Sequence, residues 1–133
     1  MQVLLGLLFS VMLHSCSNSR KVILLSSDYT TKIELDSLTS ILADEKNEVV
    51  MIPVDKLTES DLKNADVVCY HRMDTASIDG VEKNLCSLLL PYVENGGKLL
   101  LSMEAVRLLN AWKIEPSSVE VEYQDATDNG FGR

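Results

Sequence analysis

Hydrophobic positions follow two different periods that alternate along most of the chain. Short, nearly continuous apolar runs occupy residues 21–27 (KVILLSS), 49–54 (VVMIPV), 66–73 (DVVCYHRM) and 98–102 (KLLLS). Runs of this length are typical of strands that are buried on both faces of a sheet. Between the runs, leucines recur at a spacing of three and four residues, as in Leu35, Leu38 and Leu42. This spacing predicts amphipathic helices between the strands.

Polar residues mark the predicted ends of these helices. Thr31 with Glu34, and Asp79 with Glu82, have the spacing of capping boxes, in which two residues three apart cap each other's backbone. The helix after Asp79 contains Pro91, which we expect to kink it because proline lacks an N–H and clashes with the preceding turn. An Asn-Gly-Gly run then predicts the end of that helix.

Strand and helix therefore alternate, with a short helix predicted over residues 58–65 and a last helix over residues 104–112. Such alternation predicts right-handed crossovers and a parallel sheet with helices on both faces. We expect the strand order 2-1-3-4, which is a flavodoxin-like α/β arrangement. Residues 119–124 (VEVEYQ) differ, because apolar and polar residues alternate. This period predicts a half-exposed strand, either at an edge or antiparallel.

The N-terminus carries a separate signal. Residues 3–13 are an apolar run that is too short to span a bilayer but has the length of a signal-peptide core. The run leads into LHSC, which resembles the lipobox of bacterial lipoproteins. The resemblance implies that residues 1–15 are a signal peptide, that Cys16 is lipidated, and that residues 16–20 form a tether. Secretion without lipid and a cytosolic core strand are the alternatives.

Export with a lipid anchor would place the protein in the cell envelope, attached to a membrane. Ser17 and Asn18 follow the cysteine without the acidic residue that often retains lipoproteins at an inner membrane, so we expect the outer membrane.

Composition and charge narrow the class of protein. The chain has 133 residues, 46% of them hydrophobic and 24% charged, which fits one globular domain of ordinary size. Its formal net charge is -8, so a phosphate backbone would be repelled and nucleic acid is not an expected partner. Cys69 and Cys86 are interpreted as small buried hydrophobic residues, and no spacing rule supports a disulfide between them.

The predicted fold also predicts where a ligand would bind. In open α/β sheets, ligands bind beyond the carboxyl ends of the strands, at the point where the strand order reverses. With the order 2-1-3-4, this crevice lies between the first and third strands. The candidate ligand-binding residues there and on the neighbouring fourth strand are Ser27, Asp28, His71, Arg72, Asp74, Ser102 and Glu104.

Two interpretations remain open for the polar cluster after the third strand. His71, Arg72 and Asp74 could hydrogen-bond a sugar or a carboxylate, or Arg72 and Asp74 could form a local ion pair. Ser102 is expected to cap the last helix, and the alternative is a nucleophile activated by His71.

The stretches ADVVCYHRMDT and LLLPYVENGGKLLLS resemble the class I glutamine amidotransferase-like superfamily, in particular its ThuA-like and β-galactosidase-trimerisation-like branches. The resemblance covers residues 21–116. In catalytic members the fourth strand enters a Gly-x-Cys-x-Gly turn, and His and Glu partners follow later. Here the turn is Ser102-Met103-Glu104, and no histidine follows it. The resemblance therefore implies the frame of that site without its nucleophile.

The same resemblance bears on the extent of the domain and on its ligand. Members of the superfamily continue past the fourth strand, so we expect the domain over residues 21–133 to be incomplete at its C-terminus. An apolar face would then be exposed for oligomerisation, with Leu99, Leu100, Leu101, Leu108, Leu109 and Trp112 as its candidates. Relatives of this kind often accompany carbohydrate-processing enzymes, which implies a carbohydrate ligand.

Cofactor chemistry finds little support in the sequence. The loop SSDYTT has no glycine and would place Asp28 against a flavin phosphate. A receiver domain needs two acids after the first strand, where this chain has one, and His71 and Asp74 have no third metal ligand at a recognisable spacing. We expect no cofactor and no metal.

These expectations define three candidate functions. The first is an exported, lipid-anchored, non-catalytic α/β domain that binds glycans or supports their processing. The alternatives are a hydrolase whose remaining catalytic parts lie beyond residue 133, and a structural or oligomerisation module.

Overall fold

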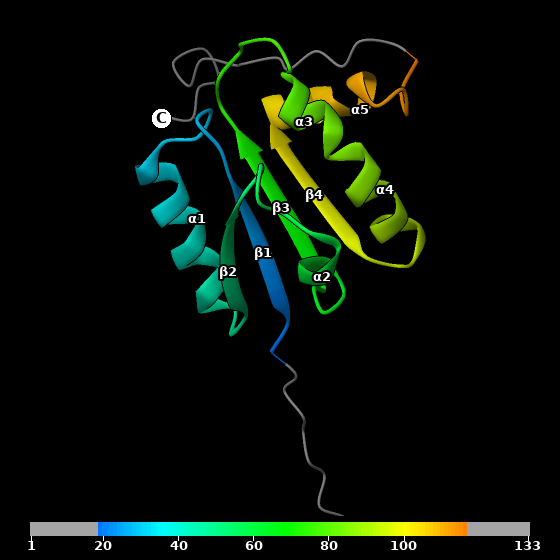
Figure 1. The fold of residues 1–133 in the computed structure, drawn as a ribbon. Coiled ribbons are helices and arrows are strands. Elements are labelled where there is room, and N and C mark those ends of the chain that lie inside the picture. The colour runs from blue at the N-terminus through cyan, green and yellow to red at the C-terminus, as the bar shows by residue number, and fades with distance from the viewer. Residues whose placement is uncertain (1–18, 117–133) are drawn as a thin grey trace, which may run out of the picture.

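The computed structural model describes residues 19–116, which form one four-stranded sheet with the strand order β2-β1-β3-β4 (Figure 1). The strands are β1 (Lys21–Ser26), β2 (Glu48–Pro53), β3 (Val67–Arg72) and β4 (Lys98–Met103). Each pair of neighbouring strands is parallel. The flavodoxin-like order predicted from the sequence is confirmed.

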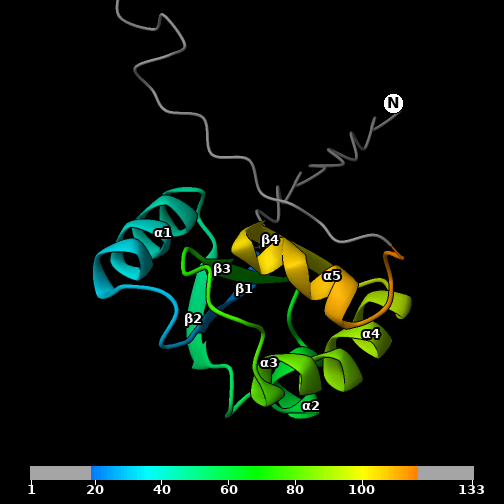
Figure 2. The same cartoon turned by 90° about the horizontal axis from the view of Figure 1, so that it is seen from above.

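Helices lie on both faces of this sheet. They are α1 (Lys32–Asp44), α2 (Glu59–Leu62), α3 (Gly80–Asn84), α4 (Cys86–Glu94) and α5 (Leu108–Ala111), with the 3₁₀ helix η1 (Glu104–Arg107) before α5. Figure 2 shows α1 on one side of the sheet and α2, α3 and α4 on the other. The right-handed crossover rule explains this division, because the step from β1 to β2 runs in the opposite direction to the later steps.

The hydrophobic core has two parts, one on each face of the central strand β1. Val22 and Leu24 point toward α1 and pack with Leu35 and Cys69. The intervening residues of β1 point toward the other helices and belong to a larger cluster with Val68, Tyr70, Leu89 and Leu108. β1 is therefore buried on both faces, as its continuous apolar run predicts.

Capping boxes begin three of the helices. The two predicted boxes, Thr31 with Glu34 and Asp79 with Glu82, are present at α1 and α3. A third box, Thr58 with Asp61, begins α2. Each box satisfies backbone N–H groups that have no partner inside the helix.

The Asn-Gly-Gly run ends α4 as predicted. The N–H of Gly97 donates to the carbonyl of Tyr92 at 3.0 Å and the N–H of Gly96 donates to that of Val93 at 2.9 Å, which is the hydrogen-bond pattern of a Schellman motif. Gly96 has a φ of +93°, a value that glycine adopts without strain. A Cβ atom on Gly97 would lie 2.3 Å from the Tyr92 ring, so this close approach also requires glycine.

Two predictions about helices were wrong in detail. The single helix expected after Asp79 is divided at Leu85 into α3 and α4, and Pro91 lies inside α4. At the division the carbonyl of Glu82 accepts hydrogen bonds from the N–H of Leu85 and from Nε1 of Trp112. This tertiary bond competes with the regular helical ladder at that point. The single helix predicted over residues 104–112 is a 3₁₀ turn followed by the short α5.

The predicted exposed apolar face is only partly present. Leu100 is 54% exposed, but Leu108 and Trp112 are buried because α5 packs against the larger core cluster.

The chain enters the sheet at one end and its candidate residues lie at the other. β1 begins near the bottom of Figure 1, and the carboxyl ends of the parallel strands are at the top. The predicted strand over residues 119–124, the signal peptide and Cys16 lie outside the described residues. Within residues 19–116, no helix is both long and apolar enough to cross a membrane.

Candidate functional site

The loop after β1 lies across the end of β3, at the point where a crevice was predicted. The hydroxyl of Thr30 donates to the carbonyl of His71, and the N–H of Met73 donates to the carbonyl of Tyr29 at 3.3 Å. The switch point between the two strands is therefore spanned by hydrogen-bonded backbone.

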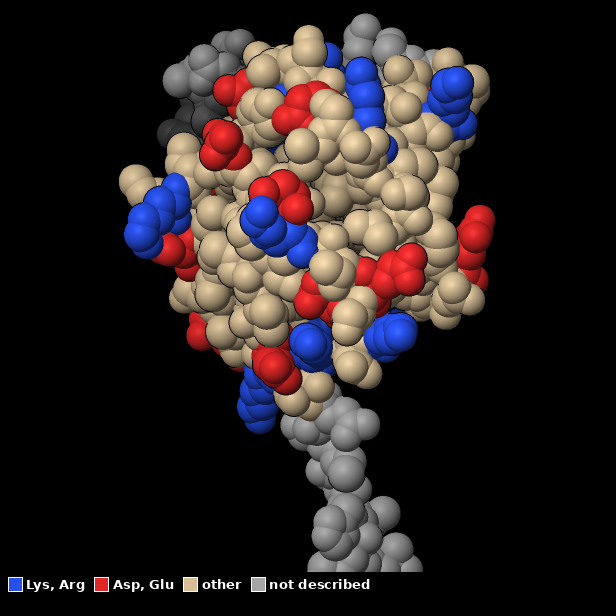
Figure 3. Space-filling model, in the orientation of Figure 1, with Lys and Arg blue, Asp and Glu red and all other residues tan. Residues whose placement is uncertain are grey.

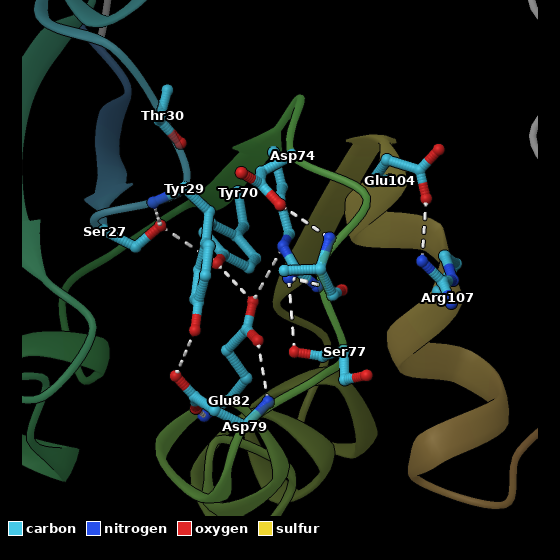
Figure 4. Close-up of polar contacts among 12 residues, drawn as sticks. Ser27, Tyr29, Thr30, Tyr70, Asp74, Ser77, Asp79, Glu82, Glu104 and Arg107 are labelled. Atoms are coloured by element: carbon cyan, nitrogen blue, oxygen red, sulfur yellow. Dashed lines mark hydrogen bonds and ion pairs between the residues drawn. The ribbon is translucent and has the colours of Figure 1, made fainter.

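A buried ion pair contacts this loop through Tyr29. Arg72 and Glu82 are both 0% exposed, and Arg72 Nε lies 3.5 Å from Glu82 Oε1. The Tyr70 hydroxyl donates to the same carboxylate oxygen at 2.6 Å (Figure 4). A buried carboxylate needs such partners to offset its desolvation.

The guanidinium of Arg72 has further partners on two sides. It lies 4.2 Å from the centroid of the Tyr29 ring, which is a cation–π contact. Its Nη2 donates to the carbonyls of Ala76 at 2.7 Å and Ser77 at 3.4 Å. Its Nη1 is buried without a hydrogen-bond partner among the described residues. Arg72 is thus enclosed by protein and holds the loops after β1 and β3 together.

The predicted ion pair between Arg72 and Asp74 does not form. Arg72 alternates with Val68 and Tyr70 on the face of β3 that points toward α3, where Glu82 lies. Asp74 lies beyond the end of the strand and accepts a hydrogen bond from the N–H of Ala76 at 2.6 Å.

Tyrosines and a second carboxylate extend the buried network toward the surface. Tyr29 donates to Asp79 at 2.9 Å, and the Ser27 hydroxyl lies 3.1 Å from that of Tyr70. Burial, with the hydrogen bond to Glu82, raises the pKa of Tyr70. The backbone N–H of Glu82 lowers the pKa of Asp79. At neutral pH the tyrosines are therefore neutral donors and Asp79 is an anionic acceptor.

His71 and Ser102 form a second contact, on the opposite face of the sheet. They are register partners on β3 and β4, and His71 Nδ1 lies 2.8 Å from Ser102 Oγ. Ser102 does not cap the last helix as predicted. The N-cap position of η1 is Met103, and no side chain caps that helix.

Met103 has the most unusual backbone at this end of the sheet. Its φ is 56° and its ψ is -132°, a region that non-glycine residues rarely occupy. The nucleophile of a strand-to-helix elbow stands on a similarly sharp, strained turn, between a sheet and the helix that follows. Met103 is the residue at this turn, and a thioether has no proton to lose and does not attack carbonyl groups as a thiolate does.

Glu104 and Arg107 connect η1 to the loop after β3. Glu104 is nearly fully buried, and Arg107 Nη1 donates to its Oε2 at 3.2 Å and to the carbonyl of Thr75 at 3.1 Å. Glu104 therefore takes part in the packing of this end of the sheet, and it does not face solvent.

Fewer of the candidate ligand-binding residues are accessible than was predicted. Asp28 and Asp74 are exposed, whereas Ser27, His71 and Ser102 are half-buried. The neighbouring surface in Figure 3 carries acidic and basic side chains scattered among uncharged ones. Such a surface offers carboxylates that can accept hydrogen bonds.

Metal and thiol chemistry find no support among residues 19–116. No group of three or more His, Cys, Asp or Glu side chains there could hold a metal ion. Cys69 and Cys86 are free thiols, and burial raises the pKa of each. A raised pKa lowers the thiolate fraction and hence the reactivity.

Sequence reasoning missed the central role of Glu82, which was predicted only as a capping residue. The alternation of β3 could have indicated this role. Arg72 lies two residues after Tyr70 and therefore shares its inward face, where a buried arginine needs a buried anion. Tyr70 was likewise assigned only to a strand. Comparisons of the chain with protein-family models, with curated proteins and with solved structures found no match.

Proposed function

We propose that the chain is an exported, lipid-anchored and non-catalytic α/β domain that binds a glycan at the carboxyl ends of β1 and β3. The position of Met103 is the observation that supports a non-catalytic domain. Met103 occupies the strained turn between β4 and η1, with a φ of 56°, where a nucleophile would stand in an enzyme built on such an elbow. The sequence resemblance to the amidotransferase-like superfamily supports the same conclusion.

A carbohydrate fits the groups that remain accessible. Asp28 and Asp74 are exposed at the strand ends, and the ring of Tyr29 is held beside them by Arg72 and Asp79. Carboxylates accept hydrogen bonds from sugar hydroxyls, and these charge-assisted bonds are the stronger kind. Anionic ligands fit less well, because the guanidinium of Arg72 is enclosed by protein and that of Arg107 is paired with Glu104.

Binding is tested by titrating the full chain with neutral oligosaccharides and following backbone amide shifts. We expect shifts at residues 27–30 and 72–76. Asp28→Ala should weaken binding about tenfold, the equivalent of roughly 1.4 kcal/mol. Asp44→Ala is the matched control, because Asp44 is an exposed aspartate at the other end of the sheet, where α1 ends. Shifts confined to the helical faces, or equal losses in both variants, would contradict the site.

The lipid anchor is tested separately at Cys16. We expect the wild-type chain in the membrane fraction with an added lipid mass, and we expect Cys16→Ser to be released or to remain an uncleaved precursor. A soluble wild-type chain of unmodified mass would refute the anchor without affecting the glycan site.

The contact between His71 and Ser102 favours a hydrolase as the second candidate function. Its separation of 2.8 Å is within the range in which a histidine can take a proton from a serine. A fluorophosphonate probe labels activated serines, so the two candidates give opposite results. We expect no labelling of the wild-type chain. Labelling that is lost in Ser102→Ala and retained in Ser87→Ala would replace the non-catalytic proposal with the hydrolase.

A further inference from the structure

The open edge of β4 carries an apolar groove. β4 has a partner only on the β3 side among the described residues, so its outer backbone groups face away from the sheet. The groove beside it has a volume of about 500 Å³ and a hydrophobic lining that includes Leu90, Val93, Leu99, Leu101, Leu109 and Ile114. It lies between α4, β4 and α5, and none of the candidate ligand-binding residues lines it.

Such an edge is costly to leave in water. Leu100 on the strand is 54% exposed and Ile114 at the end of the groove is 45% exposed. Edge strands with hydrophobic surface pair readily with another strand, and proteins usually cover or charge them. β4 carries a single charged residue, Lys98, at its beginning.

We propose that residues 119–124 of this chain bind along the outer edge of β4 as an antiparallel fifth strand and fill the groove. This inference is independent of the glycan site. Ile114, two residues before Pro116, already lines the groove, and Figure 2 shows the last described residues beside α5, on the β4 side of the sheet. Residues 117 and 118 link Pro116 to the segment, and each residue can span up to about 3.4 Å.

Length and period both fit this position. The segment VEVEYQ has six residues, as β4 does. The chain leaves α5 near the carboxyl end of β4, so a strand that returns along the edge runs antiparallel to it. Directly opposed residues on antiparallel strands share a face of the sheet. In the register that pairs Val121 with Leu101 and Tyr123 with Leu99, every apolar residue of the segment faces the groove.

The same register places the polar residues on the other face. Glu122 lies opposite Leu100 and Gln124 lies opposite Lys98, on the α1 side of β4, where Leu100 is 54% exposed although it also lines the rim of the groove. The alternation of the segment therefore matches the two environments of the edge, one apolar and one facing solvent.

A disulfide tests the pairing directly. Opposed residues on antiparallel strands have Cβ atoms about 4.5–5.5 Å apart, close enough for a disulfide after a small adjustment. The full chain with Leu100→Cys and Glu122→Cys should form an intramolecular disulfide on mild oxidation. The control pair is Ile33→Cys with Glu122→Cys, because Ile33 is exposed on α1 and should not cross-link.

The outcomes separate the candidate occupants of the groove. Rapid intramolecular cross-linking of the first pair alone supports the proposal. Equal rates in both pairs would overturn it. A dimer in which the Leu100→Cys thiols of two chains are linked to each other would also overturn it, in favour of a second copy on the edge.

Hydrogen exchange gives a second measurement that does not depend on introduced cysteines. Val121→Asp should speed exchange of the β4 amides about tenfold, the equivalent of roughly 1.4 kcal/mol, and leave β1 unchanged. Glu120→Lys alters the polar face and should leave β4 protected. Unchanged protection of β4 in both variants would also overturn the proposal.

Discussion

Arg72 and Glu82 show how one buried pair organises three separate segments. The guanidinium contacts the ring of Tyr29 after β1, the backbone after β3 and the carboxylate at the start of α3. Removing one charge of a buried pair leaves the other uncompensated, which costs far more than the net value of the intact pair.

We therefore predict that Glu82→Gln lowers the free energy of unfolding by about 3–5 kcal/mol. Glu94→Gln is the matched control at an exposed position of α4, and it should stay within about 0.5 kcal/mol of the wild type. Urea denaturation of both variants measures the difference. Similar small effects in the two variants would mean that the Glu82 carboxylate is not needed by Arg72.

Met103 offers a second residue-scale prediction, based on its backbone and not on its side chain. A positive φ at a non-glycine residue costs about 1–3 kcal/mol, whereas glycine adopts it freely at an entropic cost of about 0.5–1 kcal/mol. Met103→Gly should therefore raise the free energy of unfolding by about 1 kcal/mol. Met103→Val should lower it, because a β-branched side chain tolerates this conformation least. Thermal denaturation compares the two variants, and stabilisation by valine would contradict the strain.

Site residues proved harder to predict from the sequence than the strands that carry them. His71 and Ser102 were placed at neighbouring strand ends, and the sheet brings them into contact. The partner of Arg72 was missed, because ten residues separate it from Glu82 and only the packing of α3 on the sheet joins them. Its short distance in sequence favoured Asp74 as the partner of Arg72. The side chain of Arg72 points inward, however, and therefore pairs with Glu82.

At the scale of elements, the end of α4 depends on the close approach of Gly97 to a tyrosine ring. Gly97 lies against the Tyr92 ring, where a Cβ atom would approach to 2.3 Å, whereas Gly80 at the start of α3 has nothing within 4 Å of that position. Gly97→Ala should lower the free energy of unfolding by about 1–3 kcal/mol. Gly80→Ala should raise it by about 0.5 kcal/mol, since alanine loses less entropy on folding. Circular dichroism during urea denaturation measures both, and equal effects would contradict the close contact.

Element boundaries that depend on local chemistry were predicted well. The two capping boxes and the Asn-Gly-Gly stop involve residues three to five apart, and the structure has each of them in place. The division at Leu85 could not be predicted locally, because the Glu82 carbonyl accepts a hydrogen bond from Trp112, which lies 30 residues later, directly after α5. The 3₁₀ turn η1 comes directly after the positive φ of Met103, and the hydrophobic period encodes neither feature.

At the scale of the whole molecule, the capping boxes make stability depend on acid pH. The pKa values of Glu34, Asp61 and Asp79 are lowered by hydrogen bonds from Thr31, Thr58 and the backbone of Glu82, respectively. A carboxyl whose folded pKa is lowered stabilises the folded state above its unfolded value, and this contribution is lost as the pH falls through the folded value. The unfolded values are 4.5 for Glu34 and 3.8 for the two aspartates.

We therefore predict that the free energy of unfolding falls progressively below pH 4.5. Glu34→Gln keeps a capping side chain but removes one titrating group, so the decline below pH 4.5 should be shallower in that variant. Urea denaturation at a series of pH values gives both curves. Parallel curves for the wild type and Glu34→Gln would show that the Thr31 cap does not contribute to the acid sensitivity.

The direction of β1 has a consequence for what can reach the strand-end site. The described chain enters at the amino end of β1, and the site lies past its carboxyl end. Six residues of strand span about 20 Å, and residues 16–20 extend at most about 17 Å. With a lipid on Cys16 and the amino end of β1 facing the bilayer, the site would stand at least a strand's length above the surface and would open away from it. Headgroups lying in the same membrane leaflet would then be out of reach, and ligands would arrive from the aqueous compartment or from polymers that cross it.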